Sequence, residues 1–192
     1  MKIILASSSP RRKELLESIG LEFTVIPSDY EEESDLALEP VEYVKYLSLK
    51  KGQAVANKHK GLIISADTIV VFKDKIIGKP RDAQHAHEIL SMLSDNTHSV
   101  FTGFTVICDN VTITEVVESQ VYFNKVPKKE IDQYVATGKP LDKAGAYGVQ
   151  DSGQNLVKKI DGCYYNVVGL PLPALIKTLE KFDIQIPLPV QT

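Results

Sequence analysis

The sequence is short of cysteine and has no excess of positive charge, and both shortages limit what the protein can be. Cys108 and Cys163 are the only cysteines among 192 residues. They lie far apart without the close spacing of metal-binding cysteines, so we expect two reduced thiols in a cytoplasmic protein. The net charge is -3 at pH 7. Because non-specific nucleic-acid binding requires a basic surface, we expect no nucleic-acid partner.

Long apolar runs are also missing. The first six residues resemble the start of a signal peptide, but the apolar run is short, and Pro10, Arg11 and Arg12 follow at once. No segment approaches the roughly 20 apolar residues of a membrane-spanning helix. Hydrophobic residues make up 43% and charged residues 24% of the chain. This composition is typical of a soluble globular protein, and we expect it to be cytoplasmic, without membrane contact.

A short apolar strand opens the chain and leads through a serine-rich turn into a helix. Ser9 is a favourable N-cap residue, and Pro10 suits the first helical position. Free backbone N–H groups, the helix dipole and the guanidinium groups of Arg11 and Arg12 all favour an anion here, with phosphate the obvious one. An ordinary strand–helix connection with solvated arginines explains the same residues equally well.

Residues 61–72 carry the strongest strand signal, and a carboxylate interrupts it. Apolar residues on both sides of the strand predict a central position with both faces covered. Asp67 lies in the middle of this run. A buried carboxylate is costly unless it is paired, bound to a metal or open to a cleft. We favour a functional site over an internal hydrogen bond or a bulge.

Several other charged or glycine-rich segments are candidates for ligand binding. The acidic run at residues 28–33 is either a solvated face or the source of one carboxylate for a divalent cation. The lysine-rich helix predicted at residues 40–58 would supply a phosphate ligand if one lysine pointed into a cleft. Lys79 lies on a constrained loop between Gly78 and Pro80. Glycines in residues 141–153 permit close approach to a ligand, or simply form a tight turn.

The remaining periodicity predicts further elements. Strands are expected at residues 22–27, 76–77, 100–108 and 111–123, and helices at 82–94, 127–138 and 172–182. In the strand at 22–27 we expect Phe23 and Val25 to be buried. Residues 155–160 and 163–168 predict a final hairpin around Asp161 and Gly162.

Five segments together resemble the Maf family of nucleoside triphosphate pyrophosphatases. The matching residues are Leu5-Ala6-Ser7 with Ser9-Pro10-Arg11-Arg12, Ala66-Asp67-Thr68, Gly78-Lys79-Pro80, Asp142 through Gln150, and Val168-Gly169-Leu170-Pro171. They occur in family order over nearly the whole chain. The resemblance implies an α/β fold with a mixed central sheet flanked by helices. It also implies an elongated, two-lobed Maf/ITPase-like architecture, with one domain over residues 1–192 and a cleft between the lobes.

The resemblance also implies an activity. Such proteins hydrolyse a nucleoside triphosphate between its α- and β-phosphates, releasing the monophosphate and pyrophosphate. Asp67 matches the general base, and the phosphate-binding residues match Ser7, Arg12, Lys51 and Lys79. A divalent cation is implied, Mg²⁺ or alternatively Mn²⁺, with Asp67 and Glu32 as its carboxylates. The family further implies a cytoplasmic homodimer.

Three positions distinguish branches of this family. The branch acting on methylated guanosine triphosphate carries Trp, Gln and Glu where this chain has Arg11, Thr68 and Gln150. The chain therefore resembles the dTTP/UTP branch, with modified pyrimidine nucleotides as further candidate substrates. The Gln150 amide offers a donor and an acceptor that match a pyrimidine edge. Gly52 stands where the family usually has alanine, and we expect it to loosen its helix. The alternative function is a nucleotide-binding regulator of cell division with little hydrolysis.

Overall fold

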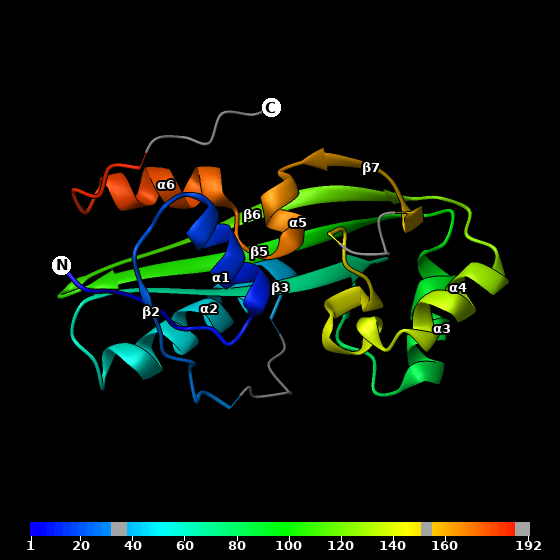
Figure 1. The fold of residues 1–192 in the computed structure, drawn as a ribbon, viewed down its shortest axis with the longest axis horizontal. Helices are drawn as coiled ribbons and strands as arrows, with labels where there is room; N and C mark the ends of the chain where they lie inside the picture. The colour runs from blue at the N-terminus through cyan, green and yellow to red at the C-terminus, as the bar shows by residue number, and fades with distance from the viewer. Residues whose placement is uncertain (32–37, 151–154, 187–192) are drawn as a thin grey trace. The chain divides into compact units, whose positions relative to one another are not determined.

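The structure is a computed structural model of a mixed α/β chain, shown in Figure 1. It describes residues 1–31, 38–150 and 155–186. The chain divides into two compact units, the first formed by residues 1–67, 102–117 and 169–192 and the second by residues 68–101 and 118–168. Three long strands contribute to both units: β3 (Leu62–Phe72), β5 (Thr97–Cys108) and β6 (Val111–Phe123).

Within the described ranges, seven strands form one mixed sheet in the order β2-β1-β3-β5-β6-β7, and β4 pairs with β3. Strand β1 (Ile3–Leu5) runs parallel to both β2 (Thr24–Val25) and β3. Strand β4 (Lys75–Ile77) pairs with β3 in the antiparallel sense, as does β7 (Val157–Gly162) with β6. Nearly every residue of β3 is buried. The prediction of a central strand covered on both faces is therefore confirmed.

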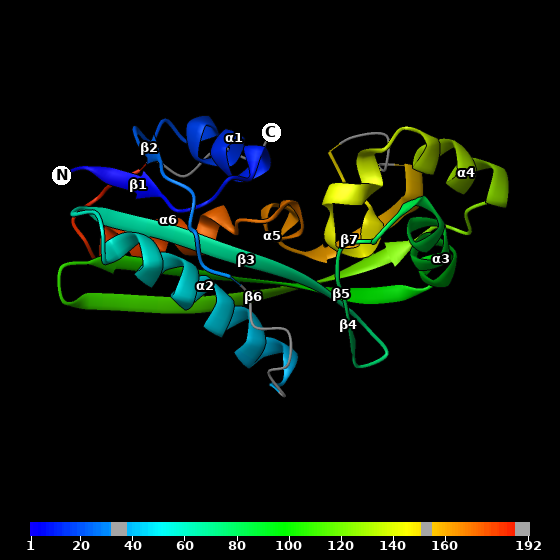
Figure 2. The same cartoon turned by 90° about the horizontal axis from the view of Figure 1, so that it is seen from below.

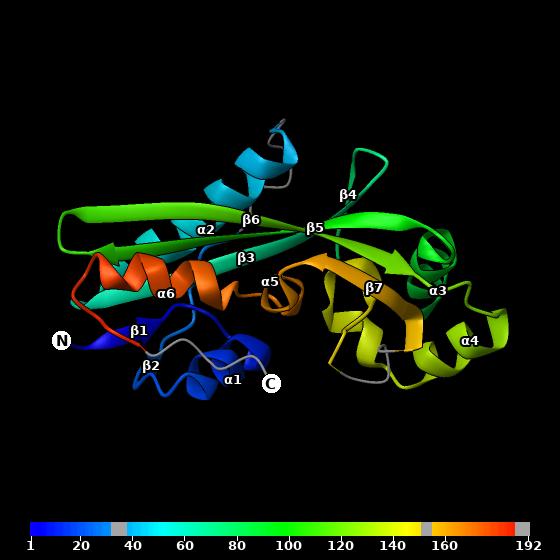
Figure 3. The same ribbon diagram turned by 90° about the horizontal axis from the view of Figure 1, so that it is seen from above.

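Three longer helices belong to the first unit: α1 (Pro10–Ser18), α2 (Pro40–Ala56) and α6 (Leu172–Glu180). Helix α1 begins as predicted, because the Ser9 side chain accepts a hydrogen bond from the backbone N–H of Arg12 and Pro10 occupies the first helical position. Figures 2 and 3 view the sheet from below and above. Helix α2 lies in front of the strands in Figure 2, and α6 lies in front of them in Figure 3, so the two helices cover opposite faces.

The second unit contains α3 (Ala83–Leu93), α4 (Lys128–Ala136) and α5 (Tyr164–Val168), with short 3-10 helices η1 (Lys139–Asp142) and η2 (Ala144–Ala146). Asp82 caps α3 as predicted, since its side chain accepts a hydrogen bond from the backbone N–H of His85 at 2.7 Å. Helix α3 packs against α4 and both 3-10 helices. No helix of the described ranges has the length and apolar character needed to cross a membrane.

The predicted final hairpin is wrong in its second half. Residues 157–162 form β7, but residues 164–168 form helix α5. The backbone N–H of Cys163 donates to Ser119 Oγ at 3.0 Å, and the buried Asn166 amide donates to Val100 O at 2.9 Å. These long-range bonds turn a segment with strand-forming side chains into a helical turn.

The prediction that Val25 is buried is also wrong. Its exposed fraction is 38%. Strand β2 has only two residues and lies at the end of the strand order, where it pairs with β1 alone. An edge strand this short has one neighbour and little to cover its faces, so its side chains stay accessible.

Candidate active site

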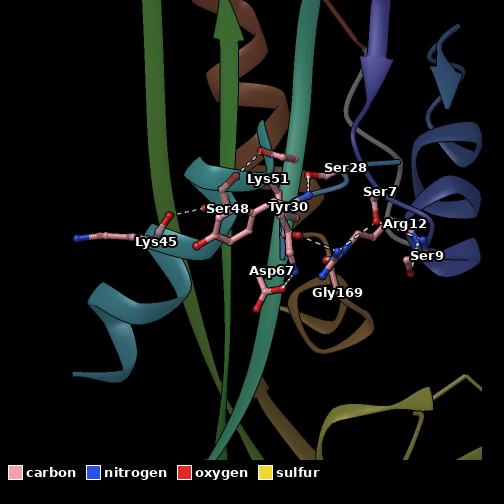
Figure 4. Close-up of polar contacts among 12 residues, drawn as sticks. Ser7, Ser9, Arg12, Ser28, Tyr30, Lys45, Ser48, Lys51, Asp67 and Gly169 are labelled. Atoms are coloured by element: carbon pink, nitrogen blue, oxygen red, sulfur yellow. Dashed lines mark hydrogen bonds and ion pairs between the residues drawn. The ribbon is translucent and has the colours of Figure 1, made fainter. Parts of the chain in front are cut away.

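Arg12 links three segments of the first unit. Its Nε donates to the carbonyl of Gly169 at 2.8 Å, and its Nη1 donates to the carbonyl of Ala66 at 2.7 Å (Figure 4). Nη1 also donates to Ser7 Oγ at 3.2 Å, and the backbone N–H of Ser9 donates to the same hydroxyl at 3.2 Å. The guanidinium therefore holds together the turn after β1, the middle of β3 and the loop before α6. Arg12 is an anchored cation and not a solvated one.

Lys51 neutralises the buried carboxylate of β3. Lys51 Nζ, on α2, lies 2.5 Å from Asp67 Oδ1 (Figure 4). The exposed fractions of the two side chains are 18% and 13%. The expectation that a carboxylate at this position needs a partner is met by an ion pair. This contact engages Oδ1 and leaves Oδ2, a carboxylate oxygen that can accept a proton or bind a cation.

The two contacts meet on β3. Ala66, whose carbonyl Arg12 binds, and Asp67, whose carboxylate Lys51 binds, are consecutive residues. An anchored guanidinium, an ammonium group and a carboxylate are thereby collected around one step of this strand. Of the residues predicted from sequence, the structure thus brings together Ser7, Arg12, Lys51 and Asp67.

Buried hydroxyl groups fix α2 against the sheet beside this ion pair. Ser65 Oγ donates to the carbonyl of Ser48 at 2.7 Å, and the hydroxyls of Ser48 and Thr105 lie 3.0 Å apart. Gly52 completes the contact, because a Cβ built there would lie 2.6 Å from Ser65 Oγ. Glycine therefore permits close packing of α2 on β3. The sequence-based expectation that Gly52 loosens its helix did not include this packing role. Sequence reasoning missed these hydroxyl groups, because serine and threonine in apolar segments carry no distinctive signal.

The first residues of the acidic segment contact α2 and the residues that directly follow this helix. Asp29 forms an ion pair with Lys58, and the Tyr30 and Tyr46 hydroxyls lie 3.4 Å apart. The side-chain hydrogen bond from Lys58 lowers the pKa of Asp29. Glu32, predicted as a metal ligand, lies outside the described residues.

Other predicted residues lie in the second unit or on α1. Thr68 directly follows Asp67 and is half-buried, while Lys79 and Gln150 are exposed. The loops that carry the latter two are connected, since the backbone N–H of Gly145 donates to the carbonyl of Gly78 at 3.1 Å. Arg11 is half-buried in the first turn of α1. Among the described residues, no group of three or more His, Cys, Asp and Glu side chains could hold a metal ion.

The comparison with protein families gives a match over most of the chain. The family described as Maf-like protein matches residues 2–182. A dTTP/UTP pyrophosphatase of Bacillus cytotoxicus is 45% identical over 183 residues, which are 95% of this chain and 96% of the relative. A dTTP/UTP pyrophosphatase of Bacillus cereus is 45% identical over 186 residues, 96% of this chain and 97% of the relative. The resemblance based on the five sequence segments is thereby confirmed.

Solved structures of low sequence similarity share the fold. The Staphylococcus aureus Ham1 protein matches with a TM-score of 0.53 at 15% identity, over 96% of this chain and 100% of that one. A HAM1 protein from Coxiella burnetii matches with a TM-score of 0.51 at 14% identity, over 94% and 99% of the two chains. At such identities the likeness concerns the backbone architecture alone.

Proposed function

The chain belongs to the Maf family, and on this premise we propose that it hydrolyses dTTP and UTP, with modified pyrimidine nucleotides as further substrates. The products are the nucleoside monophosphate and pyrophosphate. The observation that carries the proposal is the Lys51–Asp67 pair, which places a carboxylate with an uncommitted oxygen against a cation in a largely buried setting. The near full-length similarity to proteins named dTTP/UTP pyrophosphatases supports the choice of substrate.

Asp67 acts as the general base in this proposal. Its Oδ2 accepts a proton from a water molecule while the water oxygen attacks the α-phosphorus. The bond between this phosphorus and the oxygen bridging to the β-phosphate breaks, and pyrophosphate leaves with that oxygen. Lys51 holds the other carboxylate oxygen at 2.5 Å, which fixes the direction of the base. A phosphate oxygen bound by Lys51 would therefore lie close to the group that activates the water.

The phosphate charge requires cations and N–H donors. Arg12 and Lys51 supply positive charge from α1 and α2, and Ser7 lies in the turn that precedes α1. Backbone N–H groups at the start of α1 and its dipole add to the attraction for an anion. In this proposal Lys79 supplies a further positive charge for the phosphates. Stabilising the charge that develops on phosphate oxygens is the main requirement of phosphoryl transfer.

The residues present fit a divalent cation held mainly by substrate. Mg²⁺ commonly binds one or two carboxylates together with phosphate oxygens and water, and Asp67 supplies a carboxylate to the described site. Asp67 and Glu32 would hold Mg²⁺, with Mn²⁺ as the alternative. When bound, the ion would supply charge neutralisation on the phosphate oxygens. The other side chains near the Lys51–Asp67 pair that could bind such an ion also offer oxygen atoms, from hydroxyl groups, which is the ligand type that Mg²⁺ prefers.

The proposal extends to base selection, assembly and location. Arg11, Thr68 and Gln150 select the dTTP/UTP base, with the Gln150 amide pairing with the pyrimidine edge.

Residues 1–192 act as one Maf-like domain, because the family match includes residues of both compact units. The protein works as a cytoplasmic homodimer. The two half-buried free thiols, Cys108 and Cys163, are consistent with a reducing compartment.

The decisive experiment measures pyrophosphate release from dTTP, UTP, CTP and GTP by the purified chain with Mg²⁺, Mn²⁺ or EDTA. We expect turnover of dTTP and UTP with a divalent cation and none with EDTA. The alternative function, a nucleotide-binding regulator of cell division, predicts binding of UTP without pyrophosphate release. The Lys51–Asp67 geometry favours the enzyme, because binding alone does not require a carboxylate among phosphate-binding cations.

A further inference from the structure

A buried histidine and a buried tyrosine form a hydrogen bond inside the second unit. His98, on β5, is 2% exposed, and Tyr147, in the loop after η2, is 6% exposed. His98 Nε2 lies 2.7 Å from the Tyr147 hydroxyl. The Phe123 ring packs edge-on against both, with ring centroids 5.1 Å from His98 and 4.8 Å from Tyr147. The bond therefore lies within an aromatic cluster that excludes water.

This bond joins two neutral groups. Burial lowers the pKa of His98 to about 4 and raises the pKa of Tyr147 above its ordinary value. His98 Nδ1 has no hydrogen-bond partner among the described residues. An apolar side chain would fill this space without an unpaired nitrogen, so the contribution of the imidazole is its bond to Tyr147.

The loop bonded in this way has a strained backbone. Ala146 is fully buried and has a φ of 61°, in the left-handed region that residues with a Cβ rarely adopt. Gly145 before it has a φ of 70°, and a Cβ there would lie 2.9 Å from Val70 Cγ2. Tyr147 then returns to an extended conformation. Such strain persists only where surrounding contacts hold it, and it is frequent at functional sites.

Two further hydrogen bonds hold the same loop. The backbone N–H of Gly148 donates to the Tyr134 hydroxyl of α4 at 3.1 Å. The backbone N–H of Gly145 donates to the carbonyl of Gly78, next to Lys79. Val149 is buried, whereas Gln150 is exposed. Hydrogen bonds and burial thus fix the buried side of the loop, whereas the side chain of Gln150 is exposed to solvent.

We propose that His98 and Tyr147 are positioning residues for nucleobase selection, because their hydrogen bond holds the strained loop that presents Gln150. This inference rests on the proposed function, in which the Gln150 amide reads the pyrimidine edge. A preorganised amide discriminates between bases, since its two hydrogen bonds require one orientation. Neither residue touches the nucleotide. Their effect appears in the ratio of substrates and not in the chemical step.

The test is a double-mutant cycle between Tyr147→Phe and Gln150→Ala. The readout is the ratio of kcat/KM for UTP to that for GTP, and Tyr164→Phe, which removes an exposed hydroxyl outside the loop, is the matched control. We expect Tyr147→Phe to lower the ratio about fivefold, as the loss of one hydrogen bond suggests. In the Gln150→Ala background the same substitution should change the ratio less than twofold. Equal losses for both nucleotides, or an additive cycle, would overturn the inference.

Variants at His98 keep the inference testable if Tyr147→Phe unfolds. His98→Gln retains a hydrogen-bonding group and should keep most of the wild-type ratio, whereas His98→Leu should lower it. The same cycle is measured without turnover as the difference between the increases in Tm caused by UTP and by GTP. If the wild type does not hydrolyse UTP but the cycle measured by Tm still shows coupling between Tyr147 and Gln150, the proposed activity is overturned and the positioning role stands. Wild-type protein that binds neither nucleotide would overturn both.

Discussion

The Nζ of Lys51 lies 2.5 Å from Oδ1 of Asp67, and this contact joins the middle of α2 to the middle of β3. It gives a physical reason for a carboxylate in an otherwise apolar strand, because the ammonium offsets a charge that would be costly to bury alone. It also leaves one carboxylate oxygen uncommitted.

Replacing Asp67 with asparagine removes the proposed base and keeps the shape of the side chain. We expect kcat for UTP to fall roughly a hundredfold or more, because the amide cannot accept the proton. Pyrophosphate release measures the loss, and circular dichroism confirms the fold. Near-normal turnover would show that another group activates the water.

Replacing Lys51 with methionine keeps the length of the side chain and leaves the Asp67 charge unpaired. We expect the free energy of unfolding to fall by about 2 kcal/mol, less than for a fully buried pair because both side chains retain some exposure. Urea unfolding measures the change. The double variant Lys51→Met with Asp67→Asn should recover much of the stability without recovering activity. A double variant as unstable as the single one would contradict the charge argument.

Replacing Arg12 with lysine keeps the charge and removes the planar fork. One ammonium group cannot reproduce the geometry of bonds to Gly169, Ala66 and Ser7. We expect the free energy of unfolding to fall by about 1–2 kcal/mol and KM for UTP to rise about tenfold. Lys13→Ala on the same helix is the control, since its pair with Glu17 is exposed and should contribute at most about 0.5 kcal/mol. An Arg12→Lys protein with wild-type KM would argue against a role for the fork.

Replacing Gly52 with alanine should be destabilising although alanine favours helices. The added Cβ would lie 2.6 Å from Ser65 Oγ and 3.1 Å from Ile107 Cδ1. We expect a loss of about 1–3 kcal/mol, typical of overpacking. Adding Ser65→Ala removes the nearest atom and should restore part of the stability, as thermal unfolding can measure. An increase in Tm for the single variant would mean that α2 can shift without cost.

The pH dependence of stability should carry a contribution from His98. Its pKa is about 4 in the folded protein against 6.5 as the ordinary value. Between these values the unfolded chain binds more protons, so stability falls as the pH decreases from about 6.5 to about 4, by up to about 1.4 kcal/mol per pH unit. Unfolding of the wild type and His98→Leu across this range measures the effect. Parallel profiles for both proteins would show that folding does not lower the pKa of His98, so that the imidazole takes up its proton in the folded protein as readily as in the unfolded chain.

Local patterns predicted many of the elements, and the failures have a common cause. The Ser9 cap and Pro10 start of α1 and the Asp82 cap of α3 were predictable because neighbouring residues in the chain form them. Helix α5 was missed because its conformation depends on Ser119 and Asn166, which lie 44 or more positions from their partners Cys163 and Val100. Strand-forming side chains at 164–168 indicated the wrong element, since tertiary contacts override weak propensity.

What the sequence determined by itself is the set of chemical groups: a carboxylate in an apolar strand, arginines after a serine-rich turn, and glycine-rich loops in family order. The tertiary structure decided which of these groups meet. The pairing of Lys51 with Asp67, the bonds of Arg12 to Gly169 and Ala66, and the burial of His98 against Tyr147 all join residues distant in the chain. Charge and polarity are properties of single residues, whereas neutralisation and anchoring depend on distances that exist only once the strands and helices have packed.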